Sequence, residues 1–240
     1  MRRTKTKAAG GNRILAALSR EDADRLKPHL QDITVEPRQV LFEPGRATTR
    51  AYFLHDAFVS ILTAFEDGPT VETATIGPEG VVGLSLLANS SVSPGRAVVQ
   101  RGGTASMIST DRLQRAMNES PSLRTLLGRY VHAFLAQALQ TVACNAVHST
   151  SERMARRLLM SADRTDGTGF SLTHECLADM LGVGRPTVSL TARTLQTAGL
   201  IQYRRGMMQV VDRPGLEAAS CPCYAVIRRA YEQLLPLTFK

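Results

Sequence analysis

Residues 172–200, LTHECLADMLGVGRPTVSLTARTLQTAGL, have the pattern of two short helices separated by a glycine-containing turn. Thr173 is a favourable N-cap for the first helix, and Gly182 interrupts its period. The second helix has Pro186 in its first turn and Gly199 at its end. The apolar positions at helical spacing are Leu177, Met180, Leu181, Val188 and Leu195. This stretch predicts a helix-turn-helix.

A basic hairpin follows these two helices. Residues 200–203 and 208–211 alternate like two short strands around a turn that contains Arg204 and Arg205. Residues 182–211 contain four arginines and neither aspartate nor glutamate, so this winged segment would approach a polyanion without internal repulsion. We expect it to bind double-stranded DNA through Arg185, Thr187, Ser189, Arg193, Arg204 and Arg205, the second helix lying in the major groove. The alternative is an ordinary helical hairpin with a solvated basic face.

Composition agrees with a folded, two-domain protein. The chain has 240 residues, of which 43% are hydrophobic and 21% are charged, and its net charge of +8 favours nucleic acid over acidic small substrates. Residues 1–13 form an expected flexible basic leader, which lacks the apolar centre of a signal peptide. No run approaches the roughly 18 apolar residues of a membrane span, so we expect no membrane partner and a cytoplasmic location.

The cysteines and histidines do not show a metal-ligand spacing. The cysteines are Cys144, Cys176, Cys221 and Cys223. Cys221 and Cys223 are too close in sequence to offer two well-placed ligands to one tetrahedral metal, and no second pair completes such a site. The five histidines are scattered, so no metal site is predicted. Reduced thiols are the expected state, and redox sensing by Cys221 and Cys223 is the alternative.

The part before residue 110 is predicted to be mainly strands. Residues 14–27 have the pattern of an amphipathic helix with a new N-cap at Ser19 midway. Short apolar runs separated by glycine and proline turns then occupy residues 40–42, 51–54, 58–62, 71–76, 97–99 and 105–108. Many short strands with such turns are typical of a double-sheet jelly roll.

A long helix is predicted after Ser120 and Pro121, reaching about residue 147 and spanning about 40 Å. Leu123, Leu127, Tyr130 and Phe134 have near-heptad spacing and predict the seam of a homodimer. The alternative is that this side packs on the strands. The predicted fold is α+β: a basic leader (1–13), a jelly-roll-like β-roll sensor (14–119), a long dimerisation helix (120–148), a winged helix-turn-helix (149–218) and a C-terminal extension (219–240).

This order of parts resembles the Crp/Fnr family of bacterial transcription regulators. The resemblance is carried by residues 149–159, STSERMARRLL, and by the helix-turn-helix. It implies that the β-roll receives a signal and that Arg185 corresponds to the family arginine that reads a guanine. The next two base-reading positions fall on Pro186 and Leu190, which cannot make the same hydrogen bonds, so a different operator is expected.

The sensor half departs further from the family pattern. Gly83, Leu84 and Ser85 stand where the family has a Gly-Glu-Leu element, while Arg96 and Ala97 preserve its phosphate-facing arginine. Leucine cannot accept hydrogen bonds from a ribose, so cyclic AMP is not expected and no cofactor is identified. These five residues are a possible pocket for an unknown small-molecule or redox effector, and Arg96 as a surface residue is the alternative.

No catalytic motif accompanies this pattern, and no enzyme activity is expected. The predicted function is sequence-specific transcription regulation as a homodimer on DNA, with RNA polymerase as a further candidate partner. The alternative is a small-molecule or redox-sensing module with a vestigial DNA domain.

Overall fold

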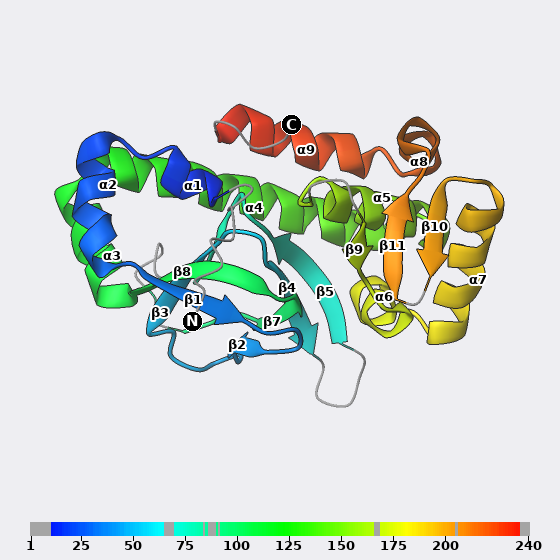
Figure 1. Ribbon diagram of the computed structural model, residues 1–240, viewed down its shortest axis with the longest axis horizontal. Coiled ribbons are helices and arrows are strands. Elements are labelled where there is room, and N and C mark those ends of the chain that lie inside the picture. Colours follow the sequence, from blue (N-terminus) through cyan, green and yellow to red (C-terminus); the bar gives the residue numbers. More distant parts are fainter. Residues whose placement is uncertain are drawn as a thin grey trace, which may run out of the picture.

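A long helix, α4 (Pro121–Val147), crosses the molecule and organises the other elements around it (Figure 1). The computed structural model describes residues 11–64, 70–83, 85, 90, 92–165, 169–204 and 206–235. The β-roll lies along one side of α4, the helix-turn-helix lies at its C-terminal end, and α9 (Cys223–Leu234) runs along it. The predicted α+β class is confirmed.

The β-roll consists of two four-stranded antiparallel sheets, with strand orders β1-β8-β3-β6 and β2-β7-β4-β5. The strands are β1 (Gln31–Val35), β2 (Val40–Phe42), β3 (Arg50–Leu54), β4 (Phe58–Ala64), β5 (Thr70–Ile76), β6 (Val81–Val82), β7 (Arg96–Arg101) and β8 (Gly103–Ser109). All six predicted strands are present. Buried residues from both sheets, including Val35, Leu54 and Val59, close one hydrophobic core between them.

Three helices and a 3-10 turn flank the β-roll. They are α1 (Arg13–Ala16), α2 (Arg20–Leu26), η1 (Lys27–His29) and α3 (Thr110–Glu119). The predicted helix over 14–27 is therefore two helices, because Ser19 leaves the helical conformation and its side chain accepts from the Asp22 N–H at 3.1 Å. The predicted interruption at Ser19 is thus observed.

The side of α4 that was predicted to be a dimer seam is occupied within the chain. Leu123, Leu127 and Tyr130 are each 0% exposed, and the Tyr130 hydroxyl donates to the Val81 carbonyl of β6 at 3.3 Å. Phe134 is half-buried and packs against the core of the β-roll. All four side chains are therefore at least partly covered within the chain, and Tyr130 and Phe134 contact the β-roll, as the alternative expects.

A different stripe of α4 is apolar and exposed. Leu135, Leu139 and Val142 are 53%, 63% and 62% exposed, and they are spaced by four and three residues. This spacing places them on one face of a helix. Helix α4 therefore carries a second apolar stripe, on a different face from the one that packs on the β-roll.

The C-terminal half begins at α5 (Thr150–Ala162), which Ser149 and Glu152 start with a reciprocal capping box. The other elements are β9 (Phe170–Ser171), α6 (His174–Leu181), α7 (Arg185–Thr197), β10 (Ile201–Arg204), β11 (Met207–Val210) and α8 (Arg213–Ala219). The strands form one sheet in the order β10-β11-β9. This is the predicted winged helix-turn-helix with one additional strand.

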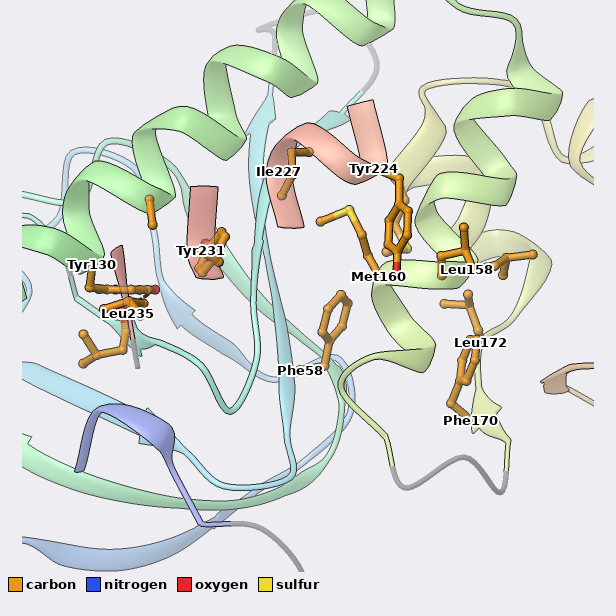
Figure 2. Packing of buried hydrophobic residues seen from close by; sticks show 14 of the residues in the cluster. Phe58, Tyr130, Leu158, Met160, Phe170, Leu172, Tyr224, Ile227, Tyr231 and Leu235 are labelled. Atoms are coloured by element: carbon orange, nitrogen blue, oxygen red, sulfur yellow. Dashed lines mark hydrogen bonds between the residues drawn. The ribbon is translucent and has the colours of Figure 1, made fainter. Parts of the chain in front are cut away.

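The C-terminal extension is part of the core. Tyr224, Ile227 and Tyr231 of α9 are buried, and one continuous hydrophobic cluster runs from Ile14 in α1 to Leu195 in α7. Figure 2 shows how aromatic and aliphatic side chains from the β-roll, α4, α5 and α9 approach one another in this cluster. Within the described residues, every helix is too short or too polar to span a lipid bilayer.

Candidate nucleic-acid interface and sensor contacts

The turn between α6 and α7 presents the start of α7 to solvent. Gly182 ends α6 with φ of +62°, a left-handed conformation that glycine adopts without steric cost. Gly184 is the N-cap of α7, and Pro186 occupies the first turn, where a backbone N–H would have no helical partner. Arg185 is consequently the first helical residue and is exposed at the end of the helix.

One face of α7 is buried and the other carries the predicted DNA contacts. Val188, Ala192 and Leu195 are at most 3% exposed and anchor the helix to the domain core. The exposed surface contains Arg185, Ser189 and Arg193 at successive i+4 spacings, and Thr187 is exposed on another side of the helix. Leu190 is 67% exposed on this surface, which suits apolar contact with a thymine methyl group.

A polar and aromatic bridge connects α6, α7 and the wing. The ring of His174 stacks on Tyr203 with centroids 4.4 Å apart, and its Nδ1 lies 2.9 Å from the Ser189 hydroxyl. Partial burial, and then the positive charge of Arg185, lower the pKa of His174. This bridge fixes the Ser189 side chain relative to the wing, and no spacing in the sequence indicated it.

The wing is a tight antiparallel hairpin. Ile201 pairs with Val210 and Arg204 with Met207, and Gly206 supplies the positive φ of +80° that the turn requires. Arg204 is exposed near the tip. Arg205, the remaining predicted phosphate contact, lies outside the described residues.

The helix-turn-helix contacts the β-roll through its first helix. Arg38, in the turn before β2, forms a 2.7 Å ion pair with Glu175 of α6. The Cys176 thiol lies 2.7 Å from the Gln100 side-chain oxygen of β7. Helix α6 therefore rests against the sensor half, while α7 stays free on its outer face.

Two buried ion pairs also join the β-roll to α5 and the turn after it. Arg157 pairs with Glu72 of β5, and Arg164 pairs with Glu79 in the turn before β6 through contacts of 2.6 and 2.8 Å to one carboxylate oxygen. All four side chains are at most 2% exposed. Burial alone would raise the pKa of Glu79, but the charge and hydrogen bonds of Arg164 outweigh it and the pKa is lowered.

In the described part of the possible effector pocket, the phosphate-facing arginine already has a carboxylate partner. Arg96 is engaged by Glu43, 3.2 Å away, and Ser85 lies 3.1 Å from the Thr48 hydroxyl. Gly83 has φ of +114°, and Ala97 is buried in the β-roll core. Leu84 lies outside the described residues. An anion at Arg96 would have to compete with the Glu43 carboxylate.

Side chains that are distant in sequence meet at the C-terminal end of α4. The ligand atoms of Cys144, His148, Cys221 and Cys223 all lie within 4.8 Å of one another. A second pair of ligand side chains beside Cys221 and Cys223, which the sequence spacing did not predict, therefore comes from α4 and its C-cap. Cys144 and His148 form a C-x-x-x-H pattern that places both side chains on one helical face, a signal which the sequence contained.

Comparisons with known proteins match both halves of the chain. The family model of the cyclic nucleotide-binding domain matches residues 32–120, and that of the Crp-like helix-turn-helix domain matches residues 152–219. No curated protein matches at the level of sequence.

Among solved structures, the chain is similar to FixK2 from Bradyrhizobium japonicum, with a TM-score of 0.70 and 17% identity over 80% of this chain and 98% of that one. It is also similar to CLP, the c-di-GMP responsive global regulator of Xanthomonas campestris, with a TM-score of 0.64 and 19% identity over 80% and 99% of the two chains. A CRP/FNR-family transcriptional regulator from Thermus thermophilus has a TM-score of 0.63 and 22% identity over 79% and 98%. At these identities the likeness concerns the fold.

Proposed function

Because the chain belongs to the Crp/Fnr family of DNA-binding transcription regulators, we propose that it binds its operator as a homodimer with one α7 helix in each of two successive major grooves. The supporting observation is the outer face of α7, where Arg185, Ser189 and Arg193 are exposed together beside a wing without acidic residues. A two-fold dimer would contact half-sites about one helical turn, roughly 34 Å, apart.

We assign different roles to the arginines of α7 and the wing. Arg185, at the N-terminal end of α7, is the direct base reader, since the first residues of a recognition helix approach base edges most closely. Thr187 and Ser189 read bases or position the helix. Arg193, Arg204 and Arg205 contact phosphates and contribute affinity that is independent of sequence.

Selection of bound DNA from a random pool tests this proposal. The full chain is expected to enrich a two-fold symmetric sequence with conserved half-sites, and binding is expected to weaken linearly with the logarithm of salt concentration. Enrichment of no motif, with equal affinity for all duplexes, would support a vestigial DNA domain instead. Repeating the selection with candidate nucleotides and under oxidising conditions tests the effector.

Arg185→Ala and Arg204→Ala are expected to weaken DNA binding in different ways. Arg185→Ala should relax specificity at one position of each half-site, at a cost of roughly 1–3 kcal/mol for the preferred base. Arg204→Ala should weaken binding to every sequence alike and reduce the salt slope by about one per protomer. Fluorescence anisotropy on the selected operator, its single-base variants and a random duplex measures both effects.

The control for these variants is Arg112→Ala, in α3 of the sensor half, which should leave both affinities unchanged. Equal losses for Arg185→Ala and Arg204→Ala on operator and random DNA would contradict the division of roles.

We further propose how a signal reaches the DNA-binding half. Residues 14–119 would sense an unidentified small-molecule or redox effector. Residues 120–148 would form the dimer and residues 149–218 would bind DNA. Residues 1–13 and 219–240 would be the segments at the two ends of the chain. Since the Glu72–Arg157 and Glu79–Arg164 pairs tie the β-roll to the start of the DNA-binding half, movement of the β-roll would change the angle between the two α7 helices. RNA polymerase is the proposed further partner, and the cytoplasm, where bacterial DNA lies, is the proposed location.

A further inference from the structure

Four metal-ligating side chains converge where the long helix ends. Cys144 and His148 come from α4 and its C-cap, Cys221 lies between α8 and α9, and Cys223 is the first residue of α9. The Cys144 and Cys221 sulfurs are 3.5 Å apart, and the Cys223 sulfur is 3.6 Å from Nδ1 of His148. The three cysteines are at most 1% exposed, carry free thiols and form a cluster separate from the main cores.

These distances agree with the ligand shell of one tetrahedral metal ion. Zinc holds cysteine sulfur at about 2.3 Å and histidine nitrogen at about 2.0–2.1 Å, so neighbouring ligand atoms stand about 3.4–3.8 Å apart. The four ligand atoms here all lie within 4.8 Å of one another, and two of their contacts already have that length. An iron–sulfur cluster distributes its cysteines over two or more iron atoms, which requires a wider arrangement.

We propose that Cys144, His148, Cys221 and Cys223 bind one Zn²⁺ ion, which cross-links the end of α4 to the start of α9. A closed Cys₃His set is typical of structural zinc sites. The proposal does not depend on the DNA contacts or on the effector pocket proposed above.

A buried arginine next to the cluster supports a charged site. Arg156 is 0% exposed, and its Nε and Nη2 have no hydrogen-bond partner in the part of the chain that the structure describes. The guanidinium lies close enough to Cys144 and Cys221 for its charge to act on both sulfurs. Three thiolates, a neutral histidine and Zn²⁺ carry a net charge of −1, which would balance the buried guanidinium.

A second group acts directly on a ligand. The side-chain N–H of Gln140, one turn before Cys144 on α4, donates to the Cys223 sulfur at 3.0 Å. Such hydrogen bonds orient metal ligands and stabilise thiolates. The hydrogen bond from Gln140 therefore positions the Cys223 sulfur within the cluster.

Binding needs neither an oxidant nor a reductant. Any of the three sulfurs that still carries a proton releases it to solvent as its bond to Zn²⁺ forms, and His148 binds through the Nδ1 lone pair. Because His148 immediately precedes Ser149, the N-cap of α5, the ion would also fix the link between the long helix and the DNA-binding half.

Cobalt titration of the full chain tests the site. Protein stripped of metal with a chelator under reducing conditions should bind Co²⁺ at one ion per chain. Intense visible absorption from tetrahedral Co²⁺ and near-ultraviolet thiolate-to-cobalt bands should appear and then vanish on addition of Zn²⁺. Elemental analysis of the purified protein should find zinc at the same ratio.

Metal binding by single-site variants distinguishes the four ligands from residues that only lie near them. Cys144→Ser, Cys223→Ser and His148→Ala should abolish stoichiometric binding, and Gln140→Leu should weaken it by about 10- to 100-fold. Cys176→Ser is the matched control, because this thiol lies against Gln100 of the β-roll, and it should bind as the parent does. Circular dichroism identifies any variant that fails to fold. Gln140→Leu keeps all four ligands, so its metal affinity can still be measured if the ligand variants do not fold.

Three results would overturn the proposal: weak, octahedral-type cobalt spectra; binding that survives in folded Cys144→Ser; or anaerobic reconstitution of an iron–sulfur chromophore in place of a mononuclear site. A Cys144–Cys221 disulfide in protein that binds no metal after reduction would assign the cluster to redox chemistry instead. Metal stoichiometry is measured without DNA, so failure of the operator-binding proposal would leave this result unaffected.

Discussion

Glu79→Gln is expected to lower the free energy of unfolding by about 3–5 kcal/mol, the cost of removing one partner from a buried ion pair. Glu79 and Arg164 are 1% and 2% exposed, and the guanidinium holds one carboxylate oxygen through both Nε and Nη2. Glutamine keeps the shape of the side chain but leaves Arg164 as an uncompensated buried charge. Urea denaturation, with transitions compared at constant m-value, measures the loss.

The matched control is Glu43→Gln, which removes the same charge from the exposed Arg96–Glu43 pair and should cost less than about 1 kcal/mol. The double variant Glu79→Leu/Arg164→Met should recover much of the stability, since it removes both charges together. A Glu79→Gln protein within about 1 kcal/mol of the parent would show that Arg164 finds solvent, and hence that the β-roll and the DNA-binding half separate readily.

The same pair predicts a pH dependence. The folded-state pKa of Glu79 is lowered, so its contribution to stability is present above the ordinary glutamate pKa and is lost as the pH falls through the lower folded value. Glu79→Gln should therefore flatten the acid limb of the stability curve relative to the parent. An unchanged acid limb would contradict the assigned direction of the shift.

The helix-turn-helix was predictable because its determinants are local. Thr173 caps α6, Gly182 adopts the left-handed conformation after it, and Val188 and Leu195 lie on the buried face of α7, as their spacing indicated. Two strands of the β-roll, β1 and β6, were not predicted. β1 alternates only from Ile33 to Val35 and β6 has two residues, so both fall short of the roughly four residues over which alternation identifies a strand.

Long-range features were beyond the reach of sequence pattern. The spacing of Leu123, Leu127 and Tyr130 correctly indicated a buried helical face, but spacing does not tell whether the covering surface is the same chain or another. The thiol cluster required knowing that α9 returns along α4. The bridge from His174 to Ser189 and Tyr203 depends on where the wing folds back, which no local preference encodes.

The corrected burial of α4 moves the dimer surface and gives the second large prediction: Leu139→Glu should convert the proposed dimer to a monomer. Leu135, Leu139 and Val142 form the exposed apolar stripe, and Leu139 is 63% exposed at its centre. In a two-fold dimer the glutamates of both protomers would lie close together at the interface. Association would then have to remove two like-charged carboxylates from water. Loss of simultaneous contact with both half-sites should reduce operator affinity by about 10²- to 10⁴-fold.

Sedimentation velocity and anisotropy on full and half operators measure the two consequences, with Val92→Glu, an exposed apolar residue of the β-roll, as the matched control. Leu139→Glu should leave the stability of the single folded chain unchanged, because residue 139 is exposed within the chain. Its urea midpoint should therefore equal that of the parent protein at a concentration low enough to dissociate the dimer. Leu127→Glu, at a position that is 0% exposed, should instead unfold the protein outright. If Leu139→Glu stays dimeric at micromolar concentration with full operator affinity, the two protomers associate through a surface other than this stripe.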